Sequence, residues 1–195
     1  MSPASRLKAI AGVAACLWLC VLSAGANAGQ FKWLVGGDKN VKYKTFKDPA
    51  ARFELEYPAN DWKLLPSGGS SLAVFARNDG PTLFINYVKM VDRLTPGEID
   101  AMPDIEVSRL KEQQPRASAF KSEMLDSKAG RGVLIRYSRG AGIPETAVQY
   151  SIPVGLDLFR LNGVIPDKQL AKYEPIVMHM IQSFTAPAAS PAPKQ

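Results

Sequence analysis

The stretch Arg52-Phe-Glu-Leu-Glu-Tyr-Pro58 alternates apolar and charged side chains with a period of two. This period is typical of a β-strand with one buried face and one solvated face, so Phe53, Leu55 and Tyr57 are expected to face a core. Pro58 has no backbone N–H and ends the strand. The chain therefore begins its folded part with a strand of a half-buried sheet.

Seven further strands are predicted downstream of this one. They lie at residues 62–65, 72–77, 83–90, 118–125, 132–137, 146–152 and 156–165. The turn Asn78-Asp-Gly-Pro81 indicates a hairpin between the second and third of them. The later connections are short and contain glycine, which implies antiparallel neighbours. Leu83–Val88 is apolar except at Asn86 and is expected to be a central strand covered on both faces.

Two helical regions complete the pattern. Thr95-Pro-Gly-Glu98 has the form of a capping box, in which threonine caps a helix and glutamate reaches back to it. Pro103 is expected to kink or split this helix, and Asp104 to cap its second piece. A second helix closes the domain, because one apolar stripe recurs every three or four residues. The stripe consists of Tyr173, Ile176, Val177, Met180, Ile181 and Phe184.

The N-terminus has the three parts of a secretory signal peptide over residues 1–28. A basic start precedes the uncharged run Ala9–Ala24, and Ala26-Asn-Ala28 offers a cleavage site after Ala28. A periplasmic or secreted location follows. A second interpretation is that Val13-Ala-Ala-Cys16 is a lipobox, which would leave Cys16 lipid-anchored. Both cysteines of the chain lie within residues 1–28, so the mature chain would fold without disulfides or thiolate sites.

The excess positive charge of the mature chain lies in residues 29–47, a basic N-terminal arm with five lysines and one aspartate. The chain carries a formal charge of +6, and residues 48–195 contain equal numbers of acidic and basic side chains. Such an arm is either a solvated leader or a docking segment for an acidic partner or an anionic membrane surface. The candidate partner-binding residues are Lys39, Lys42, Lys44 and Lys47. Nucleic acid is not an expected partner, because the arm lacks interleaved arginines and stacking aromatics.

The sequence offers little for catalysis or for metal binding. His179 is the only histidine and is expected at the surface, which leaves no catalytic triad and no zinc site. The pairs Glu54 with Glu56 and Asp100 with Asp104 are carboxylates without a recognisable acid–base or cation-binding pattern. We therefore expect no catalytic residue, no metal and no cofactor.

Three further features are interpreted mainly as structural. Trp62 is expected in the core, with a ligand platform as the alternative, and Met178 and Met180 are interpreted as ordinary fillers of the closing helix. Arg131, Arg136 and Arg139 share one predicted hairpin and are interpreted as a solvated face, with contact to an anion or a protein as the alternative.

Several of these residues recur in a known family pattern. Phe46-Lys-Asp48 leads into the strand that ends in Tyr57-Pro58, Trp62 follows, and the closing helix ends in Ser183-Phe184. Over about residues 44–184 the chain resembles the PsbP-like family and its DcrB and Mog relatives. The resemblance implies an α+β fold, an α/β/α sandwich with a mainly antiparallel sheet of about six to seven strands and a C-terminal amphipathic helix. It also implies an accessory or binding protein without enzymatic activity, and in PsbP itself a basic N-terminal segment docks on a membrane complex.

These observations divide the chain into residues 1–28, 29–47, a PsbP-like domain at 48–184, and a flexible Pro/Ala tail at 185–195. The leading hypothesis is an exported, non-enzymatic protein-binding module that docks to an envelope protein or complex. The second is a small-molecule or lipid-binding periplasmic protein with an apolar pocket near Trp62 or Pro103. The third, ranked below both, is a carboxylate-dependent hydrolase.

Overall fold

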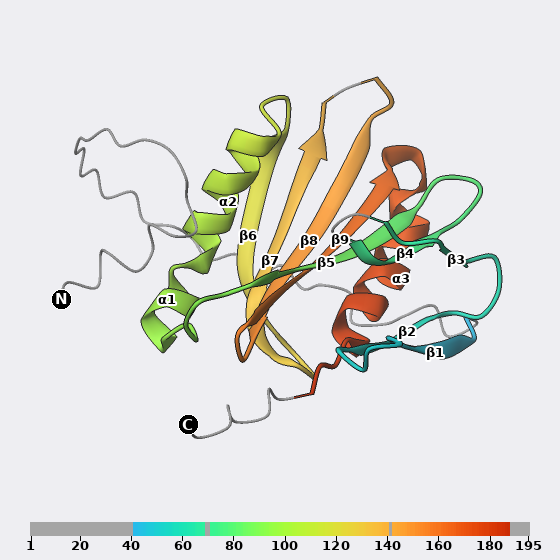
Figure 1. The fold of residues 1–195 in the computed structure, drawn as a ribbon. Coiled ribbons are helices and arrows are strands. Elements are labelled where there is room, and N and C mark those ends of the chain that lie inside the picture. Colours follow the sequence, from blue (N-terminus) through green and yellow to red (C-terminus); the bar gives the residue numbers. More distant parts are fainter. Residues whose placement is uncertain (1–40, 69–70, 141, 188–195) are drawn as a thin grey trace. The chain divides into compact units, whose positions relative to one another are not determined.

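The computed structural model describes residues 41–68, 71–140 and 142–187. The predicted signal peptide, the Cys16 alternative, Lys39 and residues 188–195 of the tail lie outside these ranges. The described residues form a seven-stranded sheet with the order β3-β4-β5-β9-β8-β7-β6, in which all neighbours are antiparallel (Figure 1). Its strands are β3 Lys63–Leu65, β4 Ser71–Ala76, β5 Thr82–Lys89, β6 Ser118–Ser127, β7 Gly130–Arg139, β8 Glu145–Val154 and β9 Asp157–Pro166.

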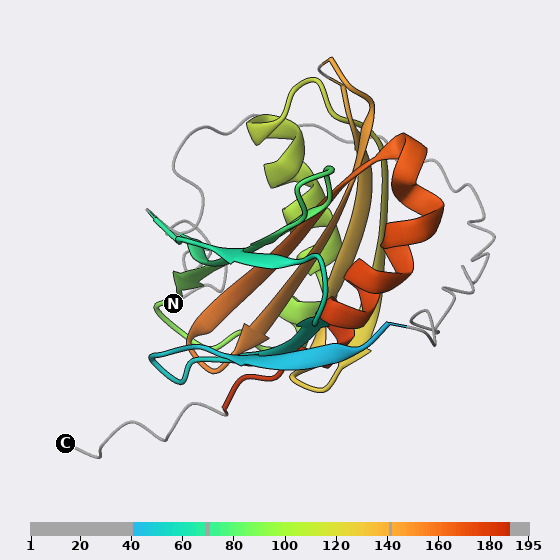
Figure 2. The same ribbon diagram turned by 90° about the vertical axis from the view of Figure 1, so that its right-hand side faces the viewer.

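Helices cover both faces of this sheet. Helices α1 (Pro96–Asp100) and α2 (Met102–Gln113) lie on one face, and α3 (Leu170–Ser183) lies on the other after the 3-10 turn η3 (Asp167–Gln169) (Figure 2). The architecture is the predicted α+β sandwich with a closing helix. No helix in the described part of the chain is long and apolar enough to span a bilayer.

A second, two-stranded sheet flanks α3. Strand β1 (Tyr43–Lys47) pairs antiparallel with β2 (Glu54–Pro58). The boundary expected at Lys47 therefore falls inside this sheet, and the described fold already includes the last residues of the basic arm. At the other end, Thr185 bridges to Glu54, with both backbone N–H···O distances at 2.8 Å.

Each face of the main sheet has its own core. The α3 side buries Phe53, Leu55 and Trp62 together with the whole apolar stripe of the closing helix. The α2 side buries the smaller group Met90, Met102, Leu110, Val133, Ile135, Tyr137, Ala147 and Leu158. The core assignment of Trp62 is confirmed, which removes Trp62 as an exposed ligand platform, and Met178 and Met180 of the closing helix are buried as well.

The capping box at Thr95 is confirmed, whereas the cap at Asp104 is wrong. Thr95 Oγ1 accepts from the Glu98 N–H at 3.3 Å, and Glu98 Oε2 accepts from the Thr95 N–H at 2.8 Å. The helix divides at Ala101, which occupies the N-cap of α2. Pro103 then stands in the first turn of α2, where a backbone N–H needs no helical partner, so the break falls before it and Asp104 lies too late to cap.

Strand β5 is central in the sheet but is not covered on both faces along its full length. Tyr87 is 36% exposed and Val88 45% exposed. The register with β4 runs from Thr82 to Asn86, so the last residues of β5 extend past that pairing. The apolar run Leu83–Val88 therefore did not predict burial at its C-terminal end, because burial depends on which other elements pack on the strand.

Candidate functional site

The candidate site from the sequence is the lysine segment, defined here as Lys42, Lys44 and Lys47. All three side chains are exposed, on or directly before β1. Lys47 Nζ lies 3.1 Å from Glu54 Oε1, and Lys44 Nζ lies 4.8 Å from the centre of the Tyr57 ring. Surface pairs of this kind contribute little stability and leave the charges open to a partner. The lysine segment therefore presents exposed cations along an ordered strand, and alternation places Lys42 and Lys44 on one face of it and Lys47 on the other.

A set of contacts with α3 holds this strand in place. His179 Nε2 lies 2.8 Å from Glu56 Oε2, and the His179 ring stacks on Tyr43 with centroids 3.8 Å apart. Ser183 Oγ accepts from the Glu56 N–H at 2.9 Å. His179 was expected to be an ordinary surface residue, and it is instead a half-buried link between the helix and the small sheet.

The turn between β1 and β2 is built on the buried Asp48. Its carboxylate accepts from Arg52 Nε and from Arg52 Nη2, both at 2.8 Å, and from the backbone N–H groups of Ala50 and Arg52 at 3.2 Å. The hydrogen bonds from Arg52 lower the pKa of Asp48, against the effect of its burial. Asp48 therefore stays ionised and closes the turn that carries the lysine segment.

A second buried carboxylate is Glu106, which no local pattern in the sequence indicates. It accepts from Arg160 Nη2 and Arg109 Nη2 at 2.8 Å, from Ser151 Oγ at 2.9 Å and from Gln149 Nε2 at 3.0 Å. Burial opposes its ionisation, but the hydrogen bonds and charges of the two arginines prevail and lower its pKa to about 2. Such a carboxylate ties α2 to β8 and β9 and holds no proton to donate at neutral pH.

The carboxylate pairs considered from sequence do not converge on a common point. Glu54 lies against Lys47, whereas Glu56 lies against the His179 ring. Asp100 Oδ1 lies 3.5 Å from Arg131 Nη1, and Asp104 is exposed. Among the described residues, no group of three or more His, Cys, Asp or Glu side chains is placed to hold a metal ion.

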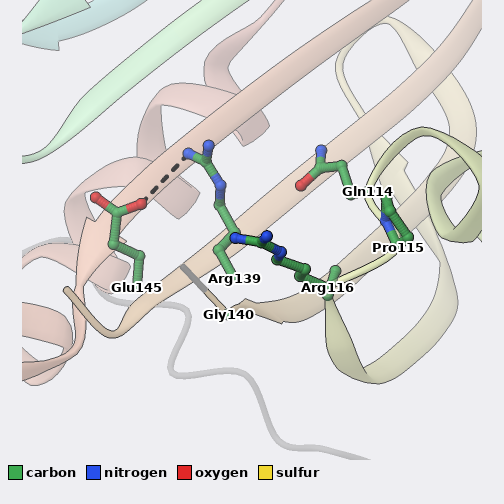
Figure 3. A pocket seen from close by; sticks show the side chains of 7 residues that line it. Gln114, Pro115, Arg116, Arg139, Gly140 and Glu145 are labelled. Atoms are coloured by element: carbon green, nitrogen blue, oxygen red, sulfur yellow. Dashed lines mark ion pairs between the residues drawn. The ribbon is translucent and has the colours of Figure 1, made fainter. Parts of the chain in front are cut away.

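The three arginines of the predicted hairpin do not form one cluster. Alternation along β7 places Arg136 on the α3 face, opposite to Arg131 and Arg139. Arg136 Nε lies 3.0 Å from Glu174 Oε1, an ion pair without hydrogen-bond geometry. Burial raises the pKa of Glu174, and the charge of Arg136 partly offsets this. Arg139 pairs with Glu145 at 3.4 Å and lines a polar cavity at the end of α2 (Figure 3).

Comparisons with known proteins identify the fold. No protein-family model matches the chain, and no curated protein matches it. The solution structure of cyanobacterial PsbP (CyanoP) from Synechocystis sp. PCC 6803 superimposes with a TM-score of 0.57 at 13% identity, over 77% of this chain and 96% of that one. The crystal structure of LpqN, involved in cell envelope biogenesis of Mycobacterium tuberculosis, gives 0.52 at 15% identity, over 77% and 94%. The chain therefore has a PsbP-like fold, as the sequence resemblance implied.

Proposed function

We propose that this protein is an exported, non-enzymatic accessory protein of the PsbP type that docks to an envelope protein or complex through its lysine segment. The observation that carries the proposal is the placement of Lys42, Lys44 and Lys47 on an anchored strand of a PsbP-like fold. Exposed cations held on an ordered segment suit recognition of an acidic surface, since charges at the rim of an interface steer association.

The anchoring contacts support recognition by a preformed surface. Asp48 closes the turn that follows the lysine segment, and Glu56 is held by both His179 and Ser183. A segment already ordered before binding loses less conformational entropy on association than a free arm does. The lysine side chains can therefore present their charge in a defined pattern.

The absence of enzymatic activity is supported by the state of the buried carboxylate. A general acid at neutral pH needs a pKa near the working pH, whereas that of Glu106 is about 2. Its oxygens accept from two arginines, a glutamine and a serine. These hydrogen bonds suit a structural role for Glu106, in which it fixes α2 to β8 and β9.

The expected export rests on the signal-peptide pattern of residues 1–28. LpqN, which shares the fold, is described as involved in cell envelope biogenesis. An envelope location for this chain agrees with both points, and an acidic envelope protein is the partner that the lysine segment would fit.

The test compares two charge-matched double variants. Lys42→Gln/Lys44→Gln removes two charges from the lysine segment, and Lys63→Gln/Lys128→Gln removes two exposed lysine charges elsewhere. Each tagged protein is recovered from the envelope fraction of its source cells after cross-linking at low and high salt. We expect one salt-sensitive partner that is lost from the first variant and retained by the second.

Equal recovery of that partner by both variants would contradict the role of the lysine segment. Vesicles with and without anionic lipid provide a second measurement. Binding of the wild-type protein to anionic vesicles alone, with no protein partner recovered, would replace the proposed protein partner with a membrane surface.

A further inference from the structure

A polar cavity of about 290 Å³ lies at the C-terminal end of α2, separate from the lysine segment. Gln114 and Arg116 border it from the turn after α2, Arg139 and Gly140 from the end of β7, and Glu145 from the start of β8 (Figure 3). Its volume is at the lower end of the range of about 300–1,000 Å³ typical of small-molecule pockets, so it suits a compact ligand.

The backbone around this cavity is held by specific contacts. The Gln114 N–H donates to the Leu110 carbonyl at 2.8 Å, and Gln114 Nε2 donates to Tyr137 Oη at 3.0 Å. The Ala117 N–H closes the turn on the Gln114 carbonyl at 2.9 Å. These bonds fix the turn that carries Arg116 against the sheet.

Gly140 brings the second wall of the cavity close to the first. A Cβ atom at this position would collide with the backbone carbonyl oxygen of Arg116. Only glycine therefore allows the end of β7 to approach the turn this closely. Because the two segments approach this closely, Arg116 and Arg139 both line the same cavity.

The charges in the cavity are not balanced. Arg139 Nη1 lies 3.4 Å from Glu145 Oε2, and both side chains are about a third or more exposed, at 43% and 31%. Arg116 forms no ion pair with any described residue, and Figure 3 shows its side chain extended from the turn toward Arg139. Of the two guanidinium groups only that of Arg139 pairs with the carboxylate of Glu145, which leaves the cavity with a net positive charge and leaves N–H donors of Arg116 unused by the described residues.

We propose that this cavity binds a compact oxyanion, supplied by a phosphate or a carboxylate group, between Arg116 and Arg139. A planar guanidinium presents paired N–H donors whose spacing matches two oxygens of such a group. The negative charge of the oxyanion balances the positive charge of the two arginines that Glu145 alone leaves uncompensated. Because the cavity is open to solvent, the binding is salt-sensitive.

The experiment titrates the full mature chain with inorganic phosphate, and separately with acetate, at constant ionic strength. The signals of the backbone amides and of the arginine guanidinium Nε–H groups are followed by NMR. Arg116→Gln is the test variant, because its side chain has no partner to lose among the described residues. Arg93→Gln is the matched control, since Arg93 is likewise exposed and makes no ion pair with a described residue. Thermal unfolding of both variants checks that the fold is retained.

We expect saturable shifts at residues 114, 116, 117, 139 and 140 with phosphate, with acetate or with both, and the pattern identifies which oxyanion is preferred. Arg116→Gln should weaken the binding about tenfold, because one charge-assisted contact is lost, and Arg93→Gln should leave it unchanged. The proposal is overturned if neither anion gives saturable shifts there, if Arg116→Gln binds as the wild type does, or if both variants lose affinity equally.

Discussion

Replacing Glu106 with glutamine should destabilise the fold strongly and in a pH-dependent way. The substitution keeps the shape of the side chain but removes the charge that Arg109 and Arg160 share. A fall in the pKa from 4.5 to about 2 corresponds to about 3 kcal/mol of folding stability, at about 1.4 kcal/mol for each pKa unit. Breaking buried ion pairs typically costs about 3–5 kcal/mol, which agrees with this figure.

The sign of the pH dependence follows from the lowered pKa. The stabilisation is fully present above pH 4.5, where the carboxyl is ionised in both the folded and the unfolded chain, and it is lost as the pH falls toward about 2. At pH 3 only about 1 kcal/mol of it remains. The stability difference between wild type and Glu106→Gln should therefore shrink markedly between pH 7 and pH 3.

Urea unfolding at the two pH values measures this difference directly. Glu112→Gln is the matched control, because Glu112 is exposed on the same helix. Its effect on the free energy of unfolding should stay within about 0.5 kcal/mol. The reasoning would be refuted if Glu106→Gln were as stable as the wild type at pH 7, or if its stability difference were the same at pH 3.

Three further substitutions test the packing and capping. Gly163→Ala should destabilise the fold by about 1–3 kcal/mol in urea unfolding, because the new Cβ collides with Val177 Cγ1 where α3 packs on β9, and unchanged stability would show that α3 can shift. Phe184→Ala should cost about 3–5 kcal/mol, since this ring is fully buried and stacks on Phe53 at 5.6 Å, and a loss below 1 kcal/mol would contradict its place in the core. Thr95→Ala should cost about 1 kcal/mol through loss of the cap, and a melting temperature equal to that of wild type would argue against it.

The fold places the proposed lysine segment and the charged side chains of the Arg116 cavity outside its apolar cores. Its two cores are closed by apolar side chains on both faces of the sheet, and the buried polar groups around Glu106 are paired with one another. The two proposed binding surfaces, the lysine segment and the Arg116 cavity, are both formed by partly or fully exposed charged side chains. Recognition at such places depends on charge and is sensitive to salt.

Local patterns in the sequence were sufficient for the helices and for eight of the nine strands, whereas β1 was assigned to the basic arm and the α/β/α layer order was implied by the family resemblance. The period of two around Phe53, the capping box at Thr95 and the stripe of the closing helix each depend on residues a few positions apart, and each is present in the structure. The excess charge of the arm is equally a property of the sequence itself. These features follow from backbone geometry and from the burial of apolar surface, which act over short separations.

Only the tertiary structure decided which polar side chains meet. Glu106 and Arg160 are 54 residues apart, and Glu56 and His179 are 123 apart, so no local period indicates either pair. A glutamate or a histidine on an amphipathic helix has the same sequence signature whether it faces water or a distant arginine. The sequence determined the helices, every strand except β1 and the charge of the chain, whereas the packing of strands far apart in sequence determined which charged side chains are paired.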